Sequence, residues 1–287
     1  MAAISASAVK ELREKTGVGM MEAKKALEES NGDLEQAIDL LRKKGLSAAA
    51  KKAGRVASEG MIASSVAGNA GSIIEVNSET DFVAKNEEFV AFAKGLADLV
   101  REKKPADVEA LSALTIDGMT VEAKRQALVQ KIGENLSLRR FEQFETDAKL
   151  ALYLHGTRIG VMVDFSGDDQ LGKDVAMHIA AANPLYLSRE TVPADIVNRE
   201  RAIYEAQAKE MGKPAAMISK IVDGKMEKFY GESCLLEQVY IKDPDGKLKV
   251  KNILKDASIR RFVRYQLGEG IEKKKECFAE EVAAQLK

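Results

Sequence analysis

The stretch from Asn77 to Asn86 contains residue types suited to recognising another protein. It reads Asn-Ser-Glu-Thr-Asp-Phe-Val-Ala-Lys-Asn, so carboxylates, a hydroxyl and an ammonium surround one aromatic ring, Phe82. The polar flanks place this stretch at the surface. An aromatic ring on a surface loop is a candidate anchor for a partner's pocket, because buried aromatic side chains dominate interface energy. In the alternative interpretation, Phe82 packs onto its own domain while Asp81 or Asn86 caps the next helix.

Residues for covalent or metal chemistry are few. The only histidines are His155 and His178, and the two cysteines, Cys234 and Cys277, have no second Cys or His at metal-ligand spacing. No glycine-rich phosphate loop ending in Lys-Ser or Lys-Thr occurs, and no serine or cysteine lies in a nucleophile motif. The sequence therefore predicts a protein that is not an enzyme, holds no metal or cofactor and does not itself bind GDP or GTP.

Composition favours a protein partner over a nucleic acid. The chain has 44 Lys and Arg against 45 Asp and Glu, a net charge of -1, which gives no basic field to attract phosphates. Its 287 residues, 45% of them hydrophobic, suffice for two or three domains with cores. We find no charged leader followed by an apolar core and no membrane-spanning apolar run. A soluble, cytoplasmic protein with reduced cysteines and no membrane contact is expected.

The Phe82 stretch joins a predicted strand to a predicted helix. A β-branched run, Ile73–Val76, precedes it, and apolar residues recur every three to four positions from Phe89 to Val100 after it. The run at 61–66 with the turn at Gly68-Asn69 predicts a hairpin partner for the strand. Further elements follow in order: a helix at 87–103 stopped before Pro105, a helix at 121–133 and a strand at 136–144.

A second hairpin and helix resemble the first. The strand patterns at 150–154 and 159–165 enclose a tight turn, a helix is predicted at 169–182, and Gly71–Val76 aligns in pattern with Gly160–Phe165. The loop of this second copy, Ser166–Leu171, contains no aromatic residue. Because the repeated fold forms there without one, Phe82 is not needed for packing, which favours an external role for its ring.

The first 45 residues predict three short helices, the arrangement found in ubiquitin-associated domains. Ser5 or Ser7 is placed to cap the first, Asp33 with Gln36 has the spacing of a capping box for the third, and Gly45 is placed to end it. A helical or extended linker is expected from residue 46 to residue 59.

The second half predicts a helical hairpin inserted into the core. Its helices fall between residues 193 and 231, with Gly212 and Pro214 at the turn. Strand-like sequence at 234–241, a short helix at 250–257 and a strand at 262–267 return to the core. An amphipathic helix at 276–286 ends the chain, with Phe278, Val282 and Leu286 on one side.

These patterns predict an α+β protein. It is expected to have a three-helix module, a core of two related antiparallel hairpin-plus-helix subdomains, an inserted helical hairpin and a C-terminal helix. The expected segments are the N-terminal module and linker (1–55), the first core subdomain (56–147), the second core subdomain in two parts (148–190 and 232–267), the inserted helical hairpin (191–231) and the C-terminal module (268–287).

Five short motifs give the chain a resemblance to a known family. They are Glu75-Val76-Asn77 followed by Thr80–Lys85; Leu12–Gly17 followed by Met20-Met21 and Lys24–Leu27; Lys131–Asn135; His155–Gly160; and Gly268–Glu272. With these motifs the sequence resembles bacterial elongation factor Ts over essentially its whole length. That family comprises the guanine-nucleotide exchange factors of the translational GTPase elongation factor Tu.

The resemblance implies a partner and a set of site residues. The partner is elongation factor Tu, nucleotide-free or bound to GDP. The loop at Thr80, Asp81, Phe82 and Val83 is implied to dislodge Mg²⁺ from that partner. The implied partner-binding residues are Lys10, Arg13, Met20, Met21, Ile132, Gly133 and His155. From the residues alone, Met20 and Met21 fit helix-end packing equally well, although two adjacent methionines cannot both enter so small a core.

The sequence alone leaves other functions open, and also other roles for the helical hairpin and the C-terminal helix. One is a ubiquitin-associated-like adaptor that binds a protein without affecting nucleotide; another is an RNA-binding translation protein, which the near-neutral charge disfavours. The helical hairpin packs on itself or mediates self-association as a homodimer. The C-terminal helix docks on its own core or on the partner, and the resemblance favours the partner.

Overall fold

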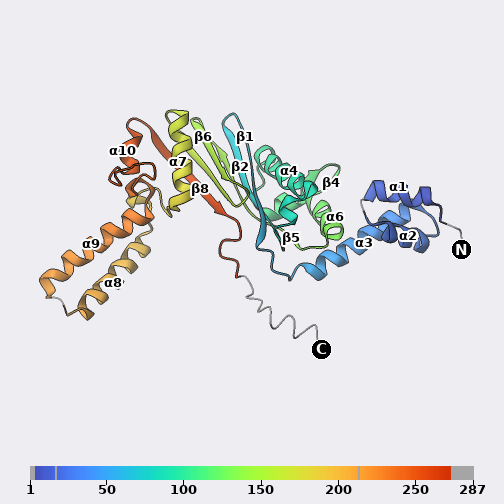
Figure 1. Ribbon diagram of the computed structural model, residues 1–287, viewed down its shortest axis with the longest axis horizontal. Coiled ribbons are helices and arrows are strands. Elements are labelled where there is room, and N and C mark those ends of the chain that lie inside the picture. The colour runs from blue at the N-terminus through green and yellow to red at the C-terminus, as the bar shows by residue number, and fades with distance from the viewer. Residues whose placement is uncertain (1–3, 17, 213, 273–287) are drawn as a thin grey trace. The chain divides into compact units, whose positions relative to one another are not determined.

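The computed structural model describes residues 4–16, 18–212 and 214–272 and contains both helices and antiparallel sheets (Figure 1). The chain forms two compact units: unit 1 comprises residues 1–65, 72–143 and 266–287, and unit 2 comprises residues 66–71 and 144–265. The two larger sheets have three strands each, in the orders β1-β2-β5 and β6-β7-β8. The expected α+β class is confirmed, while the finer division into six segments stays a prediction.

Three helices form the N-terminal module of unit 1: α1 (Ala6–Thr16), α2 (Met20–Glu29) and α3 (Leu34–Lys52). The predicted caps are present. The Ser5 hydroxyl oxygen accepts a hydrogen bond from the Ala8 amide at 3.1 Å, and the Asp33 carboxylate accepts one from the Gln36 amide at 2.9 Å. The module has its own small apolar core, which includes Leu12, Ala23, Ala26, Leu27, Ala37 and Leu41.

The expectation that Gly45 ends the third helix was wrong, because α3 continues through it to Lys52. Gly45 is buried where α3 packs on α6, and a Cβ at this position would lie 2.7 Å from the Gln130 side-chain oxygen. A glycine inside a helix costs about 1 kcal/mol relative to alanine. The alanine- and lysine-rich sequence that follows favours helix, so α3 continues, and the absence of a side chain at Gly45 leaves room for the Gln130 side chain of α6.

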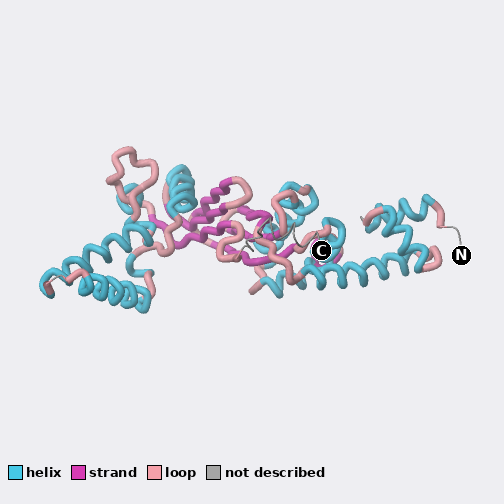
Figure 2. The backbone as a smooth tube through the Cα atoms, turned by 60° about the horizontal axis from the view of Figure 1, so that its bottom comes forward, coloured by secondary structure: helices cyan, strands magenta, loops and turns pink. Residues whose placement is uncertain are grey.

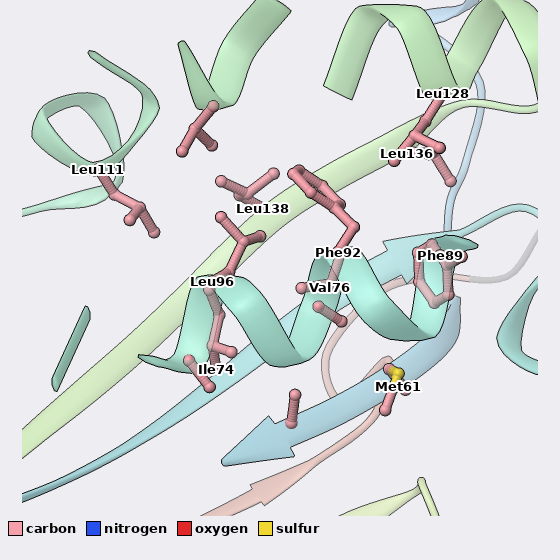
Figure 3. Close-up of a cluster of buried hydrophobic side chains, with 14 of the residues drawn as sticks. Met61, Ile74, Val76, Phe89, Phe92, Leu96, Leu111, Leu128, Leu136 and Leu138 are labelled. Carbon is pink, nitrogen blue, oxygen red and sulfur yellow. The ribbon is translucent and has the colours of Figure 1, made fainter. Parts of the chain in front are cut away.

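The core of unit 1 packs helices against its sheet. Its elements are β1 (Glu59–Ala67), β2 (Ala70–Ser78), α4 (Glu87–Lys103), α5 (Val108–Ala113), β3 (Thr115–Ile116), β4 (Met119–Thr120), α6 (Val121–Ile132) and β5 (Leu136–Glu145). Figure 3 shows Phe89, Phe92 and Leu96 of α4 in one cluster with Ile74 and Val76 of β2. Helix α5 and the two-residue strands β3 and β4 were not predicted, because such short elements carry little periodic signal.

Unit 2 contains the second hairpin and helix: β6 (Lys149–His155), β7 (Ile159–Ser166) and α7 (Asp169–Ala182), with β8 (Ser258–Gln266) beside β7. Strands β6 and β7 are antiparallel, with Lys149 opposite Phe165 and His155 opposite Ile159. The Asp168 carboxylate caps α7 by accepting from the Gln170 amide at 2.9 Å. The order strand, strand, helix of unit 1 therefore recurs here, as the internal resemblance predicted.

The predicted helical hairpin is also present in unit 2. A short turn of 3-10 helix, η2 (Arg189–Thr191), leads into α8 (Ala194–Glu210), and α9 (Ala215–Ser233) runs back beside it (Figure 2). Gly212 has a φ of +66°, a conformation that glycine adopts without strain, and the first helix ends there. Whether the hairpin mediates self-association stays a prediction.

The strand expected at residues 234–241 was wrong. The chain instead forms a second 3-10 turn, η3 (Leu235–Glu237), with isolated bridges between Tyr186 and Cys234 and between Val239 and Lys249. The 3-10 turn places the Glu237 carboxylate where it accepts hydrogen bonds from Arg189, Lys249 and Lys251, and no ladder of strand hydrogen bonds forms at residues 234–241. Helix α10 (Val250–Leu254) follows as expected, and the helix predicted at 276–286, with Cys277, lies outside the described residues.

Candidate functional site

The Phe82 loop connects β2 to α4 and presents its aromatic ring to solvent. Phe82 is 77% exposed, whereas the next residue, Val83, is 5% exposed and belongs to the apolar cluster of unit 1. The interpretation that Phe82 packs onto its own domain is therefore wrong. Because the buried valine fixes the backbone, the exposed phenylalanine ring next to it is suited to insert into an apolar pocket of another protein.

The local backbone explains why the ring points outward. A single 3-10 turn, η1 (Val83–Lys85), follows Phe82, with the Lys85 amide donating to the Phe82 carbonyl at 3.1 Å. The Asn86 side chain then caps α4 by accepting from the Glu88 and Phe89 amides at 3.0 and 3.1 Å. With Val83 buried and α4 starting at a fixed residue, Phe82 is left on the outer side of the turn.

A second segment supports the first half of the loop. The Glu134 carboxylate accepts two hydrogen bonds from Thr80, one from its amide at 2.9 Å and one from its hydroxyl at 2.6 Å. The Ser78 hydroxyl donates to the Thr80 carbonyl at 2.9 Å. Hydrogen bonds to a charged acceptor are the stronger kind, so Thr80 is held firmly in the loop.

Glu79 makes a parallel connection to the same segment. Its carboxylate accepts from the Asn135 amide at 2.6 Å and lies 3.5 Å from the Arg55 guanidinium. The Asn135 side-chain amide donates in turn to the Arg55 carbonyl at 2.9 Å. The turn between α6 and β5 and the chain after α3 therefore hold the loop that carries Phe82.

The predicted site residues Ile132 and Gly133 lie in this supporting turn. Ile132 ends α6, and Gly133 terminates the helix with a φ of +88°. Sequence reasoning missed Glu79 and Glu134 as supports of the loop, and also Asn135. The motif Lys131–Asn135 includes Glu134 and Asn135. A short motif does not show, however, that Glu134 accepts a hydrogen bond from a residue 54 positions earlier.

Asp81 is exposed beside the anchor. Its carboxylate makes no hydrogen bond or ion pair in the part of the chain that the structure describes. The Lys85 ammonium lies 6.0 Å from the centre of the Phe82 ring. Asp81 is thus available to a partner, and its role stays a prediction.

Replacing Glu134 with alanine should loosen the loop without unfolding unit 1. Two hydrogen bonds to a charged acceptor, worth about 1.5–3 kcal/mol each, would be lost, so amide hydrogen exchange at residues 79–81 should accelerate about a hundredfold or more. Mass spectrometry of exchanged peptides measures this. Glu87→Ala, at an exposed position in the first turn of α4, is the matched control. Unchanged exchange at residues 79–81 in Glu134→Ala would show that other contacts hold the loop.

The N-terminal patch is exposed as the resemblance implied. Met20 and Met21 are 60% and 65% exposed, while Ala23 of the same helix is buried in the module. Lys10 and Arg13 lie on exposed positions of α1. Neither methionine is buried in the core of the module, which agrees with the expectation that two adjacent methionines cannot both enter it, and their role in binding stays a prediction.

His155 belongs to unit 2, at the end of β6. Its Nδ1 lies 3.3 Å from the Tyr153 hydroxyl, and the residue is exposed. The family resemblance implied that His155 binds the same partner as Ile132 and Gly133. Those two residues belong to unit 1, so the shared surface stays a prediction.

His178 is a buried packing residue on α7. The Ile241 amide donates to its Nδ1 at 3.2 Å, so its Nε2 carries the proton and donates to the Gln238 side-chain oxygen at 3.0 Å. Burial lowers the pKa of His178 and keeps it neutral. Burial also raises the pKa of the Cys234 thiol to about 11, which leaves it unreactive at neutral pH.

The described residues lack two features that would point to other classes of function. No group of three or more His, Cys, Asp or Glu side chains there is arranged to hold a metal ion. Across the same residues, no helix combines the length and apolar character needed to span a bilayer.

Comparison with known proteins gives one consistent result. The family model described as elongation factor TS matches residues 79–269. Over 289 aligned positions the chain is 55% identical to proteins named elongation factor Ts from Paraburkholderia xenovorans (strain LB400), Paraburkholderia phymatum and Burkholderia multivorans. Each alignment covers 100% of this chain and 98% of the relative. The chain therefore belongs to the bacterial elongation factor Ts family of translation elongation factors.

Proposed function

We propose that this protein is a cytoplasmic guanine-nucleotide exchange factor that binds elongation factor Tu in its nucleotide-free or GDP-bound form. The observation that supports this most is the Phe82 loop, whose exposed ring sits on backbone held by Glu79 and Glu134. A loop that is already ordered loses little conformational entropy on binding. More of the free energy of burying the ring is then available to displace groups on the partner.

In this proposal Phe82 acts as a wedge. Its ring enters between two helices of the GTPase close to the bound Mg²⁺, with Thr80, Asp81 and Val83 shaping the loop around it. Burying a phenylalanine side chain contributes about 1.5–3 kcal/mol, enough to stabilise a local displacement. The groups that hold Mg²⁺ move, the β-phosphate of GDP loses its main counter-charge, and GDP dissociates faster.

Other surfaces supply affinity. The methionines Met20 and Met21, with Lys10 and Arg13, grip the GTPase domain, since flexible thioethers adapt well to a partner's surface. Ile132, Gly133 and His155 add contacts to the same partner. The protein forms and breaks no covalent bond in this cycle and binds no nucleotide of its own.

Nucleotide binding to elongation factor Tu and binding of the exchange factor are thermodynamically coupled, and this coupling determines how the exchange factor dissociates. If its binding weakens that of GDP by some factor, then GDP or GTP must weaken its binding by the same factor. Incoming nucleotide therefore releases the exchange factor, which makes one molecule reusable over many cycles.

The direct test uses elongation factor Tu loaded with fluorescent GDP and chased with unlabelled GDP. The wild-type protein should accelerate release of the label, and the acceleration should saturate as its concentration rises. In a pull-down, the complex should form without nucleotide and dissociate when GDP is added.

The adaptor alternative gives the opposite result. A ubiquitin-associated-like binding protein would be retained equally with and without GDP, and the label would leave at its intrinsic rate. Such an outcome would remove the exchange function while leaving the family assignment in place.

A further inference from the structure

A hydrogen bond joins α6 to the N-terminal module within unit 1. The Gln130 side-chain amide donates to the Glu22 carboxylate of α2 at 2.7 Å, and both side chains are half-buried. The oxygen of the same Gln130 amide faces Gly45 of α3, where a Cβ would lie 2.7 Å away. The amide of Gln130 is therefore oriented by two helices of the module at once. Its hydrogen bond to Glu22 is called the Gln130 latch below.

The latch connects two surfaces that the proposed function assigns to one partner. Its module end, Glu22, follows directly after Met20 and Met21 of the N-terminal patch, which are exposed. Its other end lies four residues before Glu134, the carboxylate that accepts two hydrogen bonds from the Phe82 loop. The last turn of α6 and the turn after it thus contact the supports of both surfaces.

Apolar packing holds the module to the rest of unit 1 near the end of α3. Ala49 of α3 is buried in the apolar cluster of unit 1. Earlier in α3, Ile38 and Leu41 line a cavity of about 740 Å³, which Met119 and Ala123 line from the rest of the unit. Space that side chains do not fill contributes no dispersion contacts to hold the helix. A helix fixed near one end can still swing, so the latch supplies a second fixed point.

We propose that Gln130 is a positioning residue for partner binding, because through Glu22 it keeps the N-terminal patch at a fixed distance from the Phe82 loop. This inference rests on the proposed function, in which both surfaces bind elongation factor Tu. When two contacts are linked at the spacing that a partner presents, the second forms at a high effective concentration once the first has formed. Opening the latch lowers that effective concentration and alters neither surface.

Loss of the latch should therefore change affinity and leave the maximal exchange rate unchanged. A hydrogen bond to a charged acceptor corresponds to about tenfold or more in an equilibrium constant, and apparent affinity falls with the fraction of molecules in the binding-competent arrangement. The Phe82 loop keeps its own supports at Glu79 and Glu134, so the rate in the saturated complex stays the same. A structural defect in the loop would instead lower the maximal rate.

The experiment compares full-length Gln130→Ala with wild type in the release of fluorescent GDP from elongation factor Tu. The half-saturating concentration should rise about tenfold at an unchanged maximal rate. Gln126→Ala is the matched control, because Gln126 lies four residues earlier on α6 and its amide donates to Glu122 of the same helix at 2.6 Å. Its half-saturating concentration should equal that of wild type. A normal half-saturating concentration in Gln130→Ala would overturn the proposal.

A change of charge tests whether the effect comes from the pairing itself. Gln130→Glu places a second carboxylate against Glu22 and should weaken half-saturation at least as much as Gln130→Ala, because like charges repel. Adding Glu22→Lys to Gln130→Glu restores an attractive pair and should return half-saturation toward the wild-type value. If the double variant binds no better than Gln130→Glu alone, the pairing does not position the module.

A double-mutant cycle tests whether Gln130 acts through the N-terminal patch. In a background in which Lys10, Arg13, Met20 and Met21 are all changed to alanine, Gln130→Ala should have no further effect on half-saturation, since the surface that it positions is gone. A further loss in that background, or a lower maximal rate in any Gln130 variant, would contradict a positioning role.

The position of the module can also be measured without the partner. Spin labels at Glu35→Cys in α3 and Glu109→Cys in α5, both exposed positions of unit 1, are introduced into a chain with Cys234→Ser and Cys277→Ser. Pulsed electron paramagnetic resonance should give a narrow distance distribution with the latch intact and a broad one in Gln130→Ala. Equally narrow distributions would refute the latch.

Failure of the exchange function is a separate outcome. If the wild type binds nucleotide-free elongation factor Tu but does not accelerate GDP release, the wedge is refuted. The distance distributions, together with the affinities of Gln130→Ala and Gln126→Ala for nucleotide-free elongation factor Tu, still decide the role of the latch.

Discussion

Replacing Phe82 with alanine should lower the maximal rate of GDP release from elongation factor Tu about tenfold to a hundredfold. The ring contributes about 1.5–3 kcal/mol when buried in the partner, and each 1.4 kcal/mol is a factor of ten. Because the side chain is 77% exposed in the free protein, its loss removes no core packing. The melting temperature should therefore remain that of wild type.

Two further substitutions define the cause of this effect. Phe82→Leu retains apolar volume on the loop and should give an intermediate rate. Met119→Ala removes a large apolar side chain that is 38% exposed elsewhere in unit 1, so it should leave release unaffected. If Phe82→Ala released GDP as fast as wild type at saturation, the wedge mechanism would have to be abandoned.

Replacing Glu237 with glutamine should destabilise unit 2 by about 3 kcal/mol. The carboxylate has a 10% exposed side chain and accepts from Lys249 at 2.8 Å, Lys251 at 3.0 Å and Arg189 at 3.2 Å. Removing the charge leaves three cations facing one another with one acceptor fewer, and breaking a buried pair is strongly destabilising. Arg189 retains Glu227, so the loss is partial.

The pH dependence of the Glu237 effect has a definite sign. A hydrogen bond from Lys249, aided by Arg189 and Lys251 against the effect of burial, lowers the pKa of Glu237 to about 2. Since the folded value lies below the unfolded value of 4.5, the unfolded state binds the proton first as pH falls. The stability gap between wild type and Glu237→Gln should be full above pH 5 and shrink between pH 5 and pH 2.

Tyrosine fluorescence during urea unfolding measures this effect in unit 2 alone. The chain has no tryptophan, and all six tyrosines lie between residues 153 and 265, within unit 2. Asp223→Asn removes an exposed pair with Arg201, worth about 0–1 kcal/mol, and serves as the control. Equal midpoints for Glu237→Gln and Asp223→Asn would contradict a stabilising role for this cluster.

The sequence by itself determined the features that depend on neighbouring residues. Caps such as Ser5, Asp33 and Asn86 act on amides two or three positions away, and the strands of each hairpin follow from alternation and a short turn. Local sequence also identified Phe82 as a candidate anchor. Its aromatic ring lies in a polar loop and does not belong to the apolar pattern of the strand before it or the helix after it, so no core position is expected for it. The short motifs carried the family assignment.

Only the tertiary structure decided which distant groups meet. Thr80 is bound by a carboxylate 54 positions later, and Glu75 by an amide 193 positions later, separations over which no periodicity extends. The helix end expected at Gly45 was wrong for the same reason. The absence of a side chain at Gly45 leaves room for the distant Gln130 side chain and does not mark the end of α3. Buried polar groups take whichever partner the fold brings within about 3 Å, since leaving them unpaired costs about 1–3 kcal/mol.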